Sequence, residues 1–164
     1  INVLIFQATW WGILLLKSNG NEALLYFWGL LGIFLQSAAI GTARFSRVVV
    51  WLAVGLIGWG LDLLLALTPI LKFNPGDETT WLLLVWVIFV STLNHSLAYF
   101  RNRRVLAGLG GAIFGPASYA VAGAWNIMGY TRDPIWLACH AGIWGFVFIA
   151  ALEITHYGEK KWSI

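Results

Sequence analysis

Few side chains in this sequence could take part in acid–base chemistry or ligand binding, and most of them interrupt long apolar segments. Asp62 stands in G-L-I-G-W-G-L-D-L-L-L, and Asn94 with His95 stands in T-L-N-H-S-L. Ionisable groups in such segments are costly, so each is a candidate functional residue. Six candidates follow from this reasoning: Asp62, Asn94, His95, Tyr119, His140 and Glu153.

Two interpretations stay open for these residues. Asp62 is either a proton or ligand site, or a structural acceptor that ties helices together by hydrogen bonds from Tyr119, His140 or a neighbouring hydroxyl. His95, beside Asn94 and Ser96, is either a ligand to a metal or haem or a histidine with ordinary structural hydrogen bonds.

The sequence lacks complete motifs for a catalytic metal or a catalytic nucleophile. Glu153 and His156 have the E-x-x-H spacing of di-iron bundles, but those need the motif twice and two further glutamates. We predict no metal site, and a single ion held by His95, Glu153 and His156 remains an alternative. The sequence contains no G-x-x-x-x-G-K-[ST], G-x-S-x-G, H-E-x-x-H or C-x-x-C pattern, so we assign no catalytic residue. The cofactor is unknown, with a pigment or haem on His95 or His140 as an alternative.

The composition indicates what kind of protein carries these residues. The 164 residues are 60% hydrophobic and 10% charged, whereas soluble domains have about 25% charged residues. The apolar excess is therefore predicted to face lipid. The single cysteine, Cys139, excludes an internal disulfide. We expect one integral membrane domain over residues 1–164, with an all-α fold.

Turn and charge signals divide the chain into about six predicted transmembrane spans: residues 2–16, 23–40, 48–71, 81–100, 105–126 and 135–157. Basic residues gather in alternate loops, with Arg44 and Arg47 in one, Arg101 to Arg104 in another, and Lys160 and Lys161 in the tail. The positive-inside rule then places both termini in the cytoplasm.

Depth along the predicted spans sorts the polar residues into two layers, at about 1.5 Å per residue. Asp62, Tyr119 and His140 fall in an outer layer. Gln36, Asn94, His95 and Glu153 fall in an inner layer near the cytoplasmic surface. Asp62 and His95 are thus expected to lie too far apart to pair.

Small residues predict where helices pack closely. The segment 105–126 contains Gly108, Gly111 and Gly115, the last two in a G-x-x-x-G step. Such faces allow close helix–helix contact in lipid. Pro116 removes a backbone donor within this segment, so we expect a kink there.

The motifs T-L-N-H-S-L (92–97) and G-A-I-F-G-P-A-S-Y (111–119), with Asp62 upstream, resemble a family of small bacterial six-helix inner-membrane proteins of unknown function. The resemblance implies a multi-pass protein of the bacterial inner membrane. It implies no reaction.

Our first functional hypothesis is a non-catalytic accessory or structural subunit of a bacterial membrane complex, with the lipid bilayer and other membrane proteins as partners. The alternatives are a carrier or lipid-handling protein using Asp62, and a membrane enzyme or pigment binder using His95 or His140. Basic residues lie at predicted membrane edges, so no nucleic-acid partner is expected.

Overall fold

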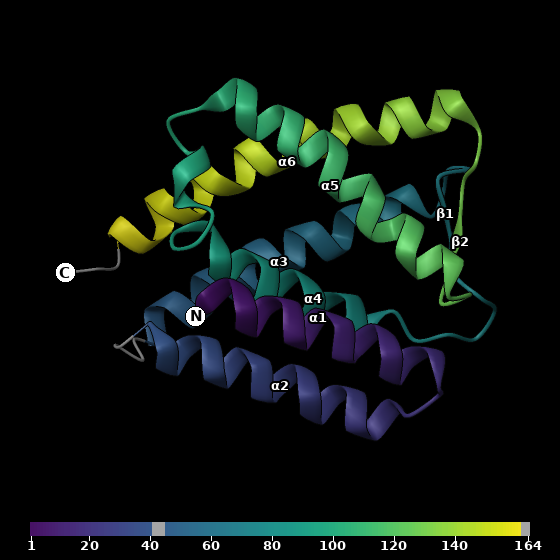
Figure 1. The fold of residues 1–164 in the computed structure, drawn as a ribbon, viewed down its shortest axis with the longest axis horizontal. Helices are drawn as coiled ribbons and strands as arrows, with labels where there is room; N and C mark the ends of the chain where they lie inside the picture. Colours follow the sequence, from purple (N-terminus) through teal and green to yellow (C-terminus); the bar gives the residue numbers. More distant parts are fainter. Residues whose placement is uncertain (41–44, 162–164) are drawn as a thin grey trace.

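The fold, taken from a computed structural model, is described for residues 1–40 and 45–161; Arg44 lies outside them. Over these residues the chain forms helices and one two-stranded ribbon (Figure 1). The helices are α1 (Asn2–Ser18), α2 (Glu22–Ala39), α3 (Phe45–Leu65), α4 (Thr80–Leu93), η1 (Ala98–Phe100), α5 (Arg104–Ala124) and α6 (Pro134–Lys161). The strands β1 (Leu71–Lys72) and β2 (Gly129–Tyr130) pair antiparallel. The predicted all-α class is confirmed.

Helix α4 lies at the centre of the bundle. Nine of its 14 residues are buried, and it packs against α1, α2, α3 and α6. Successive long helices run in alternating directions, so the N-terminus and the end of α6 lie at the same end of the molecule (Figure 1). Helix α5 packs mainly on α6.

The predicted boundaries differ most from the structure at the ends of the third and fourth helices, and both differences have a local cause. The third helix ends at Leu65 and not near residue 71. There the Thr68 hydroxyl donates to Leu65 O (2.6 Å) and accepts from Ile70 N (3.1 Å), and Pro69 disfavours helical geometry before it. The residues that follow form β1 instead.

The fourth helix ends at Leu93 and not at Phe100. A turn over residues 94–97 precedes the short helix η1. Asn94 donates to Thr155 O (3.1 Å) and accepts from the guanidinium of Arg101. Polar side chains of this kind compete with helical backbone bonding.

Glycines allow α5 and α6 to pack closely. A Cβ on Gly111 would lie 2.5 Å from Trp144 O, and one on Gly115 would lie 2.3 Å from the Trp144 ring. The backbone oxygen of Gly108 lies 3.0 Å from the Cβ position of Gly145. These approaches bring α5 and α6 together along most of α5, which runs through Pro116 as one helix.

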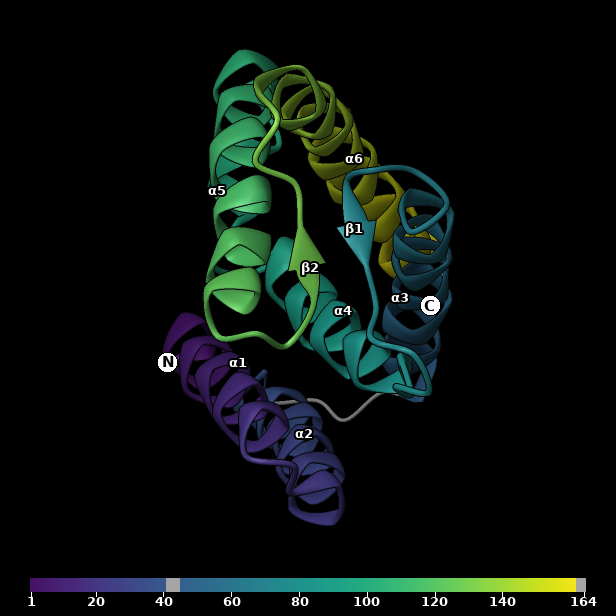
Figure 2. The ribbon, with the colours of Figure 1, turned by 90° about the vertical axis from the view of Figure 1, so that its right-hand side faces the viewer.

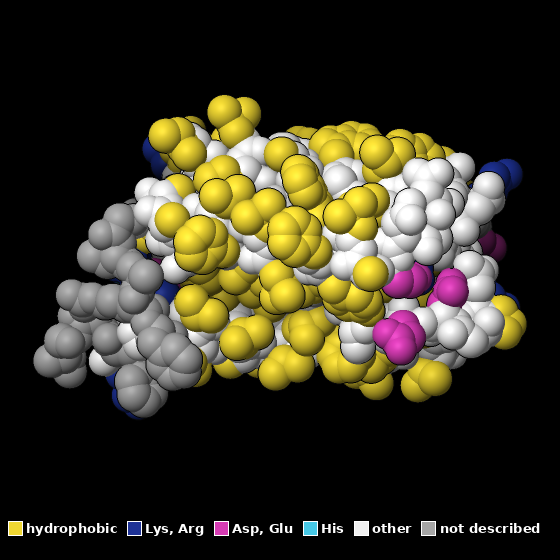
Figure 3. Space-filling view, turned by 90° about the horizontal axis from the view of Figure 1, so that it is seen from below, with side chains coloured by type: hydrophobic (Ala, Val, Ile, Leu, Met, Phe, Trp, Pro, Cys, Tyr) yellow, Lys and Arg dark blue, Asp and Glu magenta, His cyan; other side chains and the backbone are white. Residues whose placement is uncertain are grey.

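The helices and the surface are those of a helical membrane protein. By length and composition, α2, α3 from Ser46, α5 and α6 could each cross a membrane, while α1 and α4 are shorter. Large apolar side chains are exposed on the outside, among them Phe34 (68%) and Phe146 (74%). Figure 3 shows one such face, apolar in the middle, with acidic and basic groups toward its ends.

Candidate functional site

A cavity of about 460 Å³ lies between α1, α4, α5 and α6. We call it the groove. Its walls are mostly aromatic and aliphatic, with few polar side chains, and they include Phe6, Trp10, Trp86, Phe89, Phe114, Tyr119, Trp144 and Phe148. The size and the apolar lining are typical of small-molecule sites, which span roughly 300–1,000 Å³.

The groove exists because α5 packs on α6 and contacts α1 only near one end. Small residues of α5, including Gly110 and Ala117, form part of its wall. In the end-on view, α5 and α6 lie apart from α1 and α2, and α4 lies between them (Figure 2). At the end of α5, Trp125 approaches Trp11 of α1, with ring centroids 5.6 Å apart. Helix α5 thus meets α1 near one end and leaves space between them elsewhere.

A buried carboxylate lies behind the groove wall. Asp62 is fully buried. Tyr119 donates to its Oδ1 (2.6 Å) and the Trp86 indole N–H donates to its Oδ2 (2.7 Å). Tyr119 and Trp86 both line the groove, whereas Asp62 does not. The carboxylate therefore fixes two groove residues, one on α5 and one on α4, from a third helix.

His140 also belongs to the outer layer. Within the described residues, no hydrogen bond joins it to Asp62. Its Nδ1 lies 2.9 Å from the Tyr130 hydroxyl, and its ring packs edge-on to Tyr119 with centroids 4.9 Å apart. Burial raises the pKa of Tyr130 to about 12, so its hydroxyl keeps its proton, and which of the two groups donates depends on the histidine tautomer. The other ring nitrogen, Nε2, is buried and has no hydrogen-bond partner within the described part of the chain.

The inner-layer candidates lie at the opposite end and form two small hydrogen-bonded groups. Gln36 pairs with Asn2 by side-chain and backbone bonds of 2.5 and 3.0 Å, and Asn2 accepts from the Ser96 hydroxyl (2.7 Å). Asn94 links Arg101 to α6. This layer joins α1, α2, α6 and the turn after α4.

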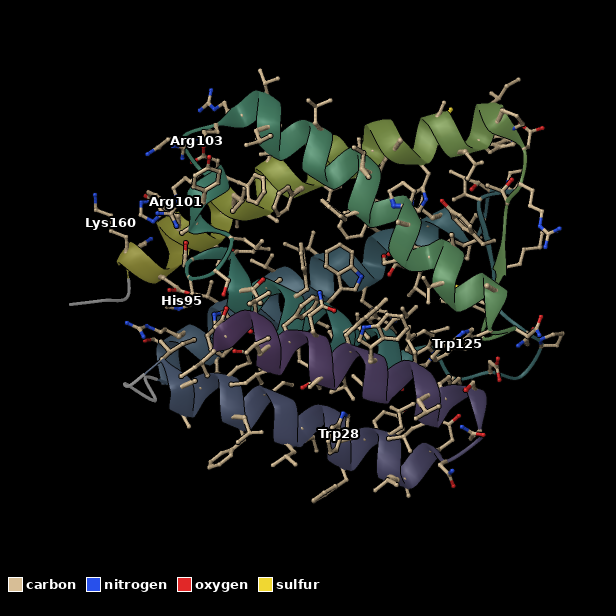
Figure 4. The ribbon with its side chains drawn as sticks, in the orientation of Figure 1. Trp28, His95, Arg101, Arg103, Trp125 and Lys160 are labelled. Carbon is tan, nitrogen blue, oxygen red and sulfur yellow. The ribbon has the colours of Figure 1, made fainter. Side chains whose placement is uncertain are left out.

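His95 lies beside these groups, in the turn after α4. Its Nε2 is buried and has no hydrogen-bond partner among residues 1–40 and 45–161. Burial lowers the pKa of His95, the charge of Glu159 opposes this, and Arg47 lowers the pKa further. Figure 4 places His95 near Arg101 at the end of the molecule that holds Lys160.

The metal alternative finds no assembled ligand set. Glu153 faces Arg104 (3.5 Å). Within the described ranges, no three His, Cys, Asp or Glu side chains gather closely enough to hold an ion. His95, Glu153 and His156 are therefore not brought together.

Sequence reasoning missed three residues of the outer layer: Trp86, Tyr130 and Trp144. Trp86 lies in the first half of α4 and Asp62 near the end of α3, at the same end of the bundle, so a depth count that included indole donors could have considered it. Tyr130 lies between two predicted spans, and a two-residue strand leaves no periodic signal. Trp144 has a buried N–H without a partner in the described residues, which no sequence pattern reveals.

Comparison with known proteins adds a family and no activity. No curated protein and no solved structure matches the chain. Residues 1–150 match the family described as a protein of unknown function (DUF2878). With nearly the whole chain matched, this protein belongs to that family.

Proposed function

We propose that this protein is a lipid-handling membrane protein that holds the hydrocarbon part of one lipid-like molecule in the groove. The observation that carries the proposal is the groove itself, about 460 Å³ of largely apolar space inside a helical membrane protein. A ligand in such a site competes with the lipids of the bilayer, so the shape of the groove must supply the preference for one ligand over another. The aromatic walls offer rigid surfaces for that purpose.

The bonds to Asp62 support a preorganised site. Tyr119 and Trp86 are each held by a separate carboxylate oxygen, and Trp86 stacks on Trp144 at 5.1 Å and 9°. Rings fixed in this way lose little freedom when a ligand binds, which favours affinity. In this proposal Asp62 positions the wall and does not touch the ligand.

The accessory-subunit hypothesis takes second place. It rests on small size, scarce charge and glycine faces. Gly111 and Gly115, which form the G-x-x-x-G step, already contact Trp144 of the same chain and so give no reason for a partner helix. An internal groove, by contrast, gives a reason for a small apolar ligand.

Filling the groove tests the proposal. Gly110 lines the groove, so the side chain in Gly110→Leu should occupy part of it. The new Cβ would make only ordinary contacts, the nearest 3.6 Å from the Phe100 ring. The matched control is Gly142→Leu, since Gly142 lies in α6, outside the groove, with nothing within 4 Å of its Cβ position. Both changes replace a helical glycine and gain similar helix propensity.

The measurement is the amount of lipid that co-purifies with each protein after extensive washing in mild detergent. We expect about one tightly held lipid per chain in the wild type and in Gly142→Leu, and a clear loss in Gly110→Leu. Equal lipid in both variants would refute the groove as the binding site.

We also propose that all six long helices lie in a bacterial inner membrane, with the end that holds Arg101, Arg103 and Lys160 in the cytoplasm. Figure 4 places these three residues at one end of the molecule, and the positive-inside rule then gives the orientation. Helix α4, at 14 residues, is about 21 Å long. Because it is surrounded by other helices, it need not match the bilayer thickness by itself.

A further inference from the structure

The groove has a polar rim at the end nearest the arginines. Three apolar residues line it there: Val3, Leu97 and Phe100. Each has a polar neighbour in the sequence: Asn2, Ser96 and Arg101. Asn2 and Ser96 bond to each other (2.7 Å). A molecule leaving the groove at this end would pass from an apolar wall to a polar surface.

The two ends of the bundle carry opposite charge balances. The end with the polar rim holds six described basic residues, Arg47, Arg101, Arg103, Arg104, Lys160 and Lys161, and two glutamates, Glu153 and Glu159. The other end has three basic residues, Lys17, Lys72 and Arg132, and four acidic ones, Glu22, Asp77, Glu78 and Asp133. A negatively charged headgroup is therefore favoured only at the first end.

Two arginines near the rim are held in place without a carboxylate. Arg103 stacks on the Tyr99 ring, with its guanidinium carbon 3.8 Å from the centroid, and donates to Tyr99 O (2.9 Å). Arg101 donates to Asn94, and its buried Nε has no partner in the described part of the chain. Among the described residues, neither forms an ion pair. The exposed guanidinium of Arg103 donates to Tyr99 O through one nitrogen, and its other N–H groups can reach the oxygens of a phosphate.

We propose that the ligand of the groove is an anionic phospholipid whose phosphate headgroup lies against Arg101 and Arg103 while its chain extends along the groove toward Tyr119. This inference rests on the proposed function and adds the charge and direction of the lipid. Zwitterionic lipids would fit the groove equally well but would gain less from the arginines.

A competition between two lipids tests the inference. Delipidated protein in detergent receives equal amounts of phosphatidylglycerol and phosphatidylcholine with identical acyl chains, and native mass spectrometry counts the bound molecules of each. We expect phosphatidylglycerol to be preferred, with a loss of about fivefold in preference for each arginine removed.

Arg103→Gln is the main variant, because Arg103 is exposed and bonds only locally. Arg101→Gln/Arg103→Gln is the second variant, and Arg132→Gln, at the other end, is the matched control. We expect both arginine variants to lose their preference for phosphatidylglycerol while the total amount of bound lipid stays constant. The control should keep the preference of the wild type.

Equal binding of both lipids by the wild type would overturn the inference but leave the groove proposal standing. Binding of neither lipid would overturn both.

Discussion

At the scale of single residues, Asp62 has the bonds expected of the structural acceptor that the sequence suggested. Its two oxygens accept from Tyr119 and Trp86 on different helices, and a proton or ligand role for Asp62 stays a prediction. Removing one donor leaves part of the carboxylate unsatisfied, and leaving a buried polar atom unpaired costs about 1–3 kcal/mol.

Tyr119→Phe should therefore lower the free energy of unfolding by about 1–3 kcal/mol. The measurement is denaturant unfolding in detergent. Tyr157→Phe, at a 70% exposed position, is the control and should change little. Equal stability of Tyr119→Phe and the control would show that the bond to Asp62 is not important for the fold.

His95 gives a pH dependence. Its pKa is lowered from the ordinary 6.5 by burial and by Arg47, against the opposing charge of Glu159. Below pH 6.5 the unfolded chain binds the proton more readily than the folded protein does, so stability falls as the pH drops. Unfolding measured from pH 8 to pH 5 should show a smaller decline in His95→Gln than in wild type. A decline in His95→Gln identical to that of the wild type would contradict this account.

How much of the site the sequence predicts depends on the residue. Depth counting placed Asp62 and Tyr119 at one level, and they touch; it also placed His140 there, but that residue bonds to Tyr130. The reason is that a residue's position along its helix predicts its height in the bundle, but not the direction in which its side chain points around the helix axis. Trp86 was missed because its indole looks like one more apolar side chain.

At the scale of elements, order and type of the helices were predictable because apolar length and turn residues are strong signals. The ends at Leu65 and Leu93 were not, because they depend on Thr68 and Asn94. The bond from Asn94 to α6 is set by tertiary packing, which a local pattern does not reveal.

The contact between α5 and α6 supports a second stability prediction. In Gly115→Ala the new methyl group would lie 2.3 Å from the Trp144 ring, which is stacked on Trp86. The ring cannot move freely, so overpacking should cost about 1–3 kcal/mol. Gly142→Ala, where the Cβ position is open, should be neutral or slightly stabilising. Thermal unfolding in detergent compares the two, and a Gly115→Ala protein as stable as the control would contradict this packing.

At the scale of the whole molecule, the two ends differ in charge and the groove runs between them. Orientation can be tested in a Cys139→Ala background with Asn102→Cys at the arginine-rich end and Glu78→Cys at the other. A membrane-impermeant maleimide added to intact cells with a permeable outer membrane should label the cysteine at position 78 and spare the one at 102. Labelling of position 102 alone would reverse the proposed orientation.

The most direct test of the central claim is photo-crosslinking with a phospholipid that carries a diazirine in its acyl chain, followed by mass spectrometric mapping of labelled residues. In lipid nanodiscs, we predict that labelling of Phe6, Trp10 and Ala117 saturates at a low mole fraction of probe, because they line the groove. Labelling of the outward-facing Phe34 and Phe146 should rise in proportion to the probe. Groove labelling that is absent, or that rises in the same linear way, would contradict a lipid held inside this protein.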